Sequence, residues 1–66
     1  MKETSKTNKE IFEQKYPSKE LSQSPAMCAE AIGYLEALIQ YLPSEEKWVH
    51  TKKTELMLML IFFALD

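Results

Sequence analysis

Residues 56–65 read LMLMLIFFAL, a run of ten consecutive apolar residues that decides the fold. Leu, Met and Ala make up most of the run and favour helices, although Ile61, Phe62 and Phe63 also suit a strand. The chain has a single glycine, Gly33, and no hairpin turn signal that would provide a partner strand. The run is therefore predicted to be the C-terminal half of a helix.

This run is too short to cross a membrane. Ten helical residues rise about 15 Å, whereas a bilayer core about 30 Å thick needs about 20 residues. Lys52, Lys53 and Glu55 prevent its extension toward the N-terminus. We therefore do not expect an integral membrane protein.

The N-terminal third of the chain predicts one short helix and a loop. Residues 1–6 are polar and without periodicity, which predicts a disordered N-terminus. Thr7 and Glu10 form a capping box that begins a helix over residues 8–16, and Pro17 ends it. The following stretch is rich in Pro, Ser and Gln, and is predicted to be a loop in which Ser18 could cap a single turn.

Two further start signals predict two longer helices. Ser24 followed by Pro25 combines an N-cap with proline at the first helical position, which predicts a helix over residues 25–42. Ser44 after Pro43 is read as the next N-cap, with acidic residues in the first turn of a helix over residues 45–65. The short linker predicts that these helices are antiparallel.

The apolar positions of the two long helices are spaced for mutual packing. In residues 25–42 they recur at intervals of 4, 3, 4 and 3, a heptad pattern widened by Ala31 and Leu38. The members of this pattern are Cys28, Ile32, Leu35, Ile39 and Leu42. On the last helix the matching face is predicted to comprise Trp48, Val49, Leu56, Met59, Leu60 and Phe63. Gly33 would permit close approach of another helix, or has no role.

These features predict an all-α fold, with a short N-terminal helix and an antiparallel two-helix hairpin in one small domain over residues 7–66. A chain of 66 residues is near the size at which one core is only marginally sufficient. Cys28 is the only cysteine, so an internal disulfide is excluded. We therefore expect the helical bundle to be completed by dimerisation or by a partner.

The predicted partner-binding residues lie on the other side of the last helix. They are Met57, Leu58, Ile61, Phe62 and Leu65. Burial of all five is worth on the order of 8–15 kcal/mol, which can offset an association cost of about 4–15 kcal/mol. The first helix, through Ile11, Phe12 and Tyr16, is expected to cover only part of this surface.

The sequence contains no signature of catalysis or of ligand binding. Cys28 lies on the apolar pattern, where a free cysteine behaves as a small hydrophobe, and His50 is expected at the surface. We therefore predict no catalytic residue, no metal site, no cofactor and no small-molecule substrate. All eight basic residues are lysines in a chain of net charge −2, and the absence of arginine argues against nucleic acid as a partner.

The favoured function is a non-enzymatic protein–protein interaction module, that is, a small adaptor, co-chaperone or inhibitor acting through the apolar helical surface of residues 56–65. One alternative is a homodimeric four-helix bundle with a structural or regulatory role. Another is a peripheral membrane protein whose C-terminal end enters lipid. The lone cysteine and the absence of a signal peptide predict a cytoplasmic location.

Overall fold

The computed structural model describes residues 7–65, and these residues contain helices and no strand, which confirms the all-α prediction. The elements are α1 (Asn8–Lys15), α2 (Ser18–Leu21), α3 (Pro25–Tyr41), the 3-10 turn η1 (Pro43–Glu45) and α4 (Glu46–Leu65). The predicted disordered segment, residues 1–6, and the last residue, Asp66, lie outside the described residues.

Two of the predicted helix start signals form the expected hydrogen bonds. The backbone N–H of Glu10 donates to Thr7 Oγ1 at 3.2 Å, and the backbone N–H of Thr7 donates to Glu10 Oε1 at 3.1 Å. This is the complete capping box of α1. At α3, the backbone N–H of Met27 donates to Ser24 Oγ at 3.2 Å, so Ser24 is the N-cap as predicted.

The other two serines do not cap helices. Ser44 was predicted to be an N-cap, but it lies inside η1, and α4 begins only at Glu46. Pro43 starts the 3-10 turn, in which the backbone N–H of Glu45 donates to the Leu42 carbonyl at 3.0 Å. Ser18 is likewise the first residue of α2 rather than its cap.

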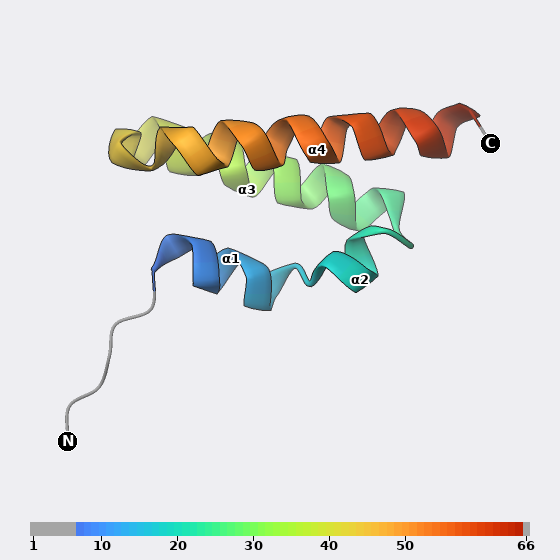
Figure 1. Cartoon of the computed structure of the whole chain (residues 1–66), viewed down its shortest axis with the longest axis horizontal. Helices are drawn as coiled ribbons and strands as arrows, with labels where there is room; N and C mark the ends of the chain where they lie inside the picture. Colours follow the sequence, from blue (N-terminus) through green and yellow to red (C-terminus); the bar gives the residue numbers. More distant parts are fainter. Residues whose placement is uncertain (1–6, 66) are drawn as a thin grey trace, which may run out of the picture.

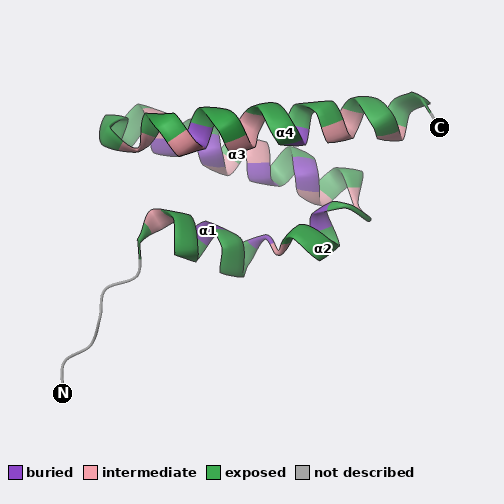
Figure 2. Ribbon diagram, in the orientation of Figure 1, coloured by how far each residue is buried: buried purple, intermediate pink, exposed green. Residues whose placement is uncertain are grey.

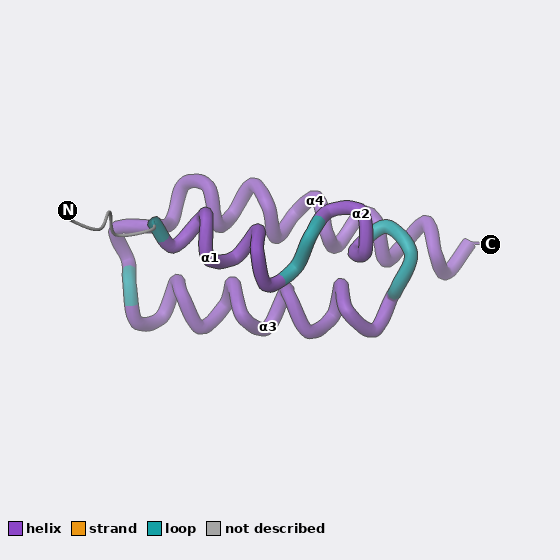
Figure 3. Tube along the Cα trace, turned by 90° about the horizontal axis from the view of Figure 1, so that it is seen from below, coloured by secondary structure: helices purple, strands orange, loops and turns teal. Residues whose placement is uncertain are grey.

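α3 and α4 form an antiparallel hairpin, and α1 and α2 lie on one side of it (Figure 1). Seen from that side, α1 and α2 run between the two long helices (Figure 3). α4 has 20 residues against 17 in α3, and its C-terminal end extends past the first turn of α3. The last turns of α4 therefore have no neighbour along part of their length.

The core lies between the α3–α4 hairpin and the α1–α2 segment, and each of the four α-helices contributes buried residues to it (Figure 2). The buried residues of α3 recur at intervals of 3, 4 and 3, and they are Cys28, Ala31, Leu35 and Leu38. α4 contributes the buried Val49 and Leu56, with Met59, Leu60 and Phe63 half-buried against the core. This confirms the predicted inner face of the last helix.

The predicted heptad pattern of α3 is wrong at its C-terminal end. Leu42 is 39% exposed, because α3 ends at Tyr41 and the backbone of Leu42 has left the helical conformation. Ile32 and Ile39 are only half-buried. The buried side of α3 is therefore centred on Ala31 and Leu38 as much as on the predicted positions.

An aromatic cluster of four rings joins α1 to the hairpin. Phe12 lies 5.4 Å from Tyr16, 5.9 Å from Tyr34 and 6.0 Å from Trp48, measured between ring centroids. Tyr16 and Tyr34 are 5.7 Å apart. Offset and tilted ring pairs at these distances are favourable beyond their buried area. Nearby, Asn8 Nδ2 donates to Glu45 Oε2 at 3.2 Å, and Trp48 Nε1 donates to the other oxygen of the same carboxylate.

Removal of the Leu35 side chain should strongly destabilise the protein. Leu35 is fully buried, so Leu35→Ala should lower the free energy of unfolding by about 2–5 kcal/mol through the cavity it leaves. Leu60 is half-buried, so Leu60→Ala should cost less. Urea denaturation measures both values, and Leu42→Ala is the control that should stay within about 0.5 kcal/mol of the parent. Equal costs for Leu35 and Leu42 would contradict this core.

Phe12→Ala should release α1 from the hairpin, because Phe12 touches the other three rings of the cluster. A buried Phe→Ala change typically costs about 3–5 kcal/mol. Trp48 reports the change directly, since loss of its ring neighbour should shift its fluorescence emission to longer wavelength. The neighbouring change Ile11→Ala, at a more exposed position, should leave the emission unchanged.

Candidate interaction surface on helix α4

The five predicted partner-binding residues lie together on the side of α4 that faces away from the core. Successive residues turn by about 100° around a helix, so positions 57, 58, 61, 62 and 65 form one continuous stripe opposite Val49 and Leu56. Their exposed fractions run from 48% to 75%. We call this stripe the back face of α4. It consists of Met57, Leu58, Ile61, Phe62 and Leu65.

The chemistry of this helix side changes halfway along α4. Its N-terminal half carries polar side chains at the same angular positions, and they are Lys47, His50, Thr51 and Thr54. All four are exposed. The polar side chains of the first half are suited to contact with solvent, whereas the second half exposes only apolar groups. The exposed apolar surface is therefore limited to the C-terminal half of α4.

The rest of the chain leaves the back face uncovered because its apolar groups are used elsewhere. Phe12 of α1 and Tyr16, which follows α1, are buried in the aromatic cluster, and Ile11 is exposed. Leu21 of α2 is buried beside the first turn of α3, where its carbonyl accepts the Cys28 thiol at 3.1 Å. The expectation that α1 covers part of this surface is therefore wrong.

A shallow hollow extends the apolar surface around the end of α4. It has a volume of about 460 Å³ and is lined by Ser22, Met59, Phe62, Phe63 and Leu65. Phe62 and Leu65 belong both to this hollow and to the back face. A partner seated on the back face would therefore also reach the crevice between α4 and the loop that follows α2.

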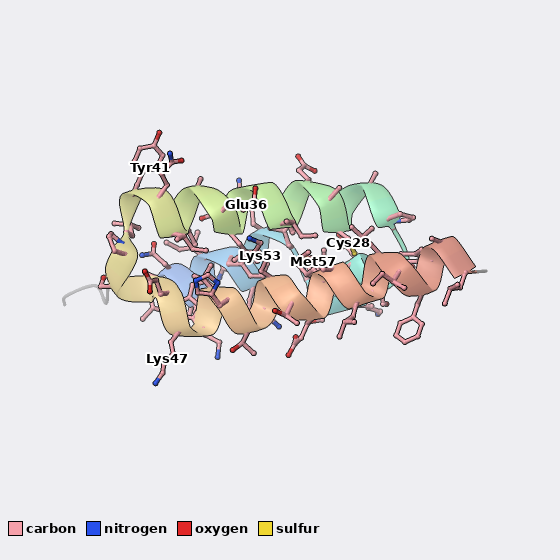
Figure 4. All side chains as sticks on the ribbon, turned by 90° about the horizontal axis from the view of Figure 1, so that it is seen from above. Cys28, Glu36, Tyr41, Lys47, Lys53 and Met57 are labelled. Atoms are coloured by element: carbon pink, nitrogen blue, oxygen red, sulfur yellow. The ribbon has the colours of Figure 1, made fainter. Side chains whose placement is uncertain are left out.

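The charged groups of α4 lie outside the apolar run. Lys53 Nζ is 3.3 Å from Glu36 Oε2 on α3 (Figure 4), and Lys52 Nζ is 3.3 Å from Glu55 Oε1. Both pairs are partly exposed and contribute little to stability. No charged residue lies between Leu56 and Leu65, so the back face offers no ionic contact of its own.

Cys28 and His50 are not brought together. Cys28 is buried, and its Sγ lies 3.5 Å from Met59 Sδ on α4. His50 is exposed and precedes Met59 by nine residues, which is about 13 Å along the helix. Burial raises the pKa of the Cys28 thiol, which disfavours the nucleophilic thiolate.

A second hollow, of about 560 Å³, lies between α1 and the first half of α4 and has a mixed lining. Its residues are Lys9, Glu13, Lys47, Trp48, Thr51, Lys52 and Glu55. Within residues 7–65 no three His, Cys, Asp or Glu side chains are grouped so that they could hold a metal ion. No helix in this part of the chain is long and apolar enough to span a membrane.

Comparison with known protein families, with curated proteins and with solved structures finds no match for this chain.

Cys28 should react with alkylating reagents only when the protein unfolds. Its burial both blocks access and raises the pKa of the thiol above the ordinary value of 9.0, so iodoacetamide at pH 8 should modify it at least about 100-fold more slowly than in denaturant. Mass spectrometry measures the rate. A cysteine introduced by Thr54→Cys, at an exposed position, is the control that should react rapidly in the folded protein.

The same burial predicts a loss of stability in alkaline solution. The pKa of Cys28 is raised by desolvation, and that of Tyr16 is raised by desolvation and then by the nearby Glu30 and Tyr34. The unfolded chain therefore loses these protons first, at the ordinary values of 9.0 and 10.0. The contribution of these two groups to stability should therefore be fully present well below pH 9 and should be lost as the pH rises through their raised pKa values, which urea denaturation at pH 8 and at higher pH measures.

Proposed function

We propose that this protein is a non-enzymatic protein–protein interaction module that binds another protein chain through the back face of α4. The observation that carries the proposal is the exposure of five large apolar side chains in one stripe. A module of this kind would act as a small adaptor, co-chaperone or inhibitor. Its single cysteine is free and buried in the fold, and we propose the cytoplasm as its location.

The size of the exposed stripe supports a binding role. If each large apolar residue is assigned about 200 Å², the middle of the range that aromatic side chains bury, the exposed fractions of the back face correspond to about 600 Å². The largest apolar patch of a typical monomer is about 300–600 Å² and is often functional. Here that area belongs to a chain whose total accessible surface is only 4849 Å².

The energy of burying this stripe is comparable to the cost of association. At about 25 cal/mol per Å², covering about 600 Å² is worth about 15 kcal/mol. The cost of bringing two protein chains together is estimated at about 4–15 kcal/mol. A partner must therefore cover the whole back face to offset this cost, because one that covers only a single turn gains much less.

The shape of the stripe favours a helix as the docking element. Its side chains recur at intervals of three and four residues, the spacing with which helices pack into each other's grooves. α1 and α2 occupy one side of the hairpin, and the side of α4 away from α3 is free to receive a helix from a partner or from a second copy. Either would complete a helical bundle. Met57, with its flexible thioether side chain, suits a surface that adapts to its partner.

A lipid surface is the weaker alternative for the same stripe. Peripheral helices that bind membranes usually carry lysine or arginine along the polar flank of their apolar face. Lys52 and Lys53 are paired with Glu55 and Glu36, and Lys47 precedes the stripe by ten residues, about 15 Å along the helix. The lysines of α4 are therefore poorly placed to attract anionic lipid headgroups to the stripe.

Site-specific photo-crosslinking tests the proposal. A benzophenone amino acid at position 58, within the back face, should form discrete protein adducts in cells of the organism that encodes this chain. Phe62→Glu should abolish these adducts, because an unpaired carboxylate would be desolvated in the contact. Tyr41→Glu is the matched control, since Tyr41 is an equally exposed aromatic at the far end of the hairpin (Figure 4), and it should leave the adducts unchanged.

The outcomes separate the alternatives. Circular dichroism should show that both glutamate variants keep the helical content of the parent. A lipid adduct without a protein adduct would replace the proposed function with membrane association. Protein adducts that persist in Phe62→Glu would mean that the back face is not the binding surface.

A further inference from the structure

We propose that the back face of α4 binds the same face of a second copy of this chain, with the two α4 helices antiparallel and a twofold axis near Ile61. This dimer rests on the proposed function and identifies the protein partner as a second copy of the chain. In this arrangement Ile61 meets Ile61 of the second copy, and Met57 meets Leu65 of the second copy. The contact is isologous, so one patch supplies both sides of the interface.

The exposed area matches the requirement of a small symmetric dimer. Each back face exposes about 600 Å², so two copies together can remove up to about 1,200 Å² from water when both faces are fully covered. Stable specific interfaces begin at about 1,200 Å² of total buried surface. A contact of this size, with no charged pair inside it, should have a dissociation constant in about the micromolar range.

The distribution of charge along α4 selects the antiparallel direction. Residues 56–65 carry no charge, so two copies of this stretch meet without repulsion. In a parallel pair, Lys47 of one copy would lie against Lys47 of the other, and the same holds for His50. Lys47 lies 14 residues before Ile61, so the antiparallel pair separates the two lysines by about 42 Å along the helix axes. Like charges at that distance are screened by salt.

The position of α4 in the fold leaves room for this contact. The back face lies on the side of α4 opposite the buried Val49 and Leu56, and α1 and α2 lie on one side of the α3–α4 hairpin (Figures 1 and 3). The C-terminal end of α4 also extends past α3. Two copies can therefore overlap their α4 ends while their hairpins lie on the outer sides of the dimer. The N-terminal half of each α4 then stays exposed to water, in agreement with its polar side chains.

Engineered cysteines test both the partner and its direction. Ile61→Cys places a thiol at the proposed axis, where the two Cα atoms can come within the range of about 4.4–6.8 Å that a disulfide needs. Thr54→Cys lies on the same side of α4 but seven residues from the axis, so an antiparallel pair separates its two thiols by about 21 Å. The native Cys28 is buried, and the unmodified chain is the background control.

Under mild oxidation the purified Ile61→Cys protein should form disulfide-linked dimers at least about tenfold more efficiently than Thr54→Cys or the parent. Sedimentation equilibrium of the parent should show a monomer–dimer equilibrium that Phe62→Glu shifts to monomer and Tyr41→Glu does not. Efficient cross-linking of both cysteine variants would overturn the antiparallel direction, since a parallel pair aligns both positions.

A parent chain that stays monomeric at millimolar concentration, with no disulfide in Ile61→Cys, would overturn self-association. The proposed function is judged separately by the photo-crosslinking adducts. Adducts of another mass at position 58, lost in Phe62→Glu, would then retain the interaction module with a different protein as its partner. Absence of both the dimer and any protein adduct would defeat the two proposals together.

Discussion

The packing of α3 on α4 is the interaction on which the other contacts of this protein depend. Leu35 of α3 and Val49 and Leu56 of α4 are fully buried in one core cluster. α1 is held mainly by rings that stand on the hairpin, Tyr34 from α3 and Trp48 from α4. Loss of the hairpin would therefore remove the surface on which α1 docks.

This dependence explains why one side of α4 remains uncovered. The short N-terminal helices have four large apolar side chains to place, and three of them, Phe12, Tyr16 and Leu21, are buried on the side of the hairpin where α1 and α2 lie. Nothing of comparable size is left within residues 7–65 to reach the opposite side. The apolar content of the last ten helical residues thus exceeds what a chain of this length can bury alone.

The sequence predicted those parts of the structure that depend on local signals. Thr7 and Ser24 cap their helices because a capping hydrogen bond spans only three residues, and the inner face of α4 follows from helical periodicity. The prediction of an N-cap at Ser44 was wrong because the preceding proline starts a 3-10 turn. The prediction that Leu42 belongs to the heptad pattern was wrong because α3 ends one residue early. The role of Tyr34 was missed, since its partners come from α1 and no local pattern encodes a contact between segments so far apart in sequence.

The back face could be located from sequence, because the exposure of a side chain follows from its position on the helix. The partner that covers it could not be predicted, because affinity depends on the partner's surface. The distribution of charged residues along α4 limits the direction in which a helix can lie on the back face. Charged residues occupy α4 up to Glu55 and are absent beyond it, so an incoming helix of either direction meets no repulsion over the apolar run and meets lysine if it continues toward Lys47. An antiparallel copy of α4 presents its own apolar run and then leaves the surface. In the proposed dimer, that direction would keep every lysine in water while the stripe is covered.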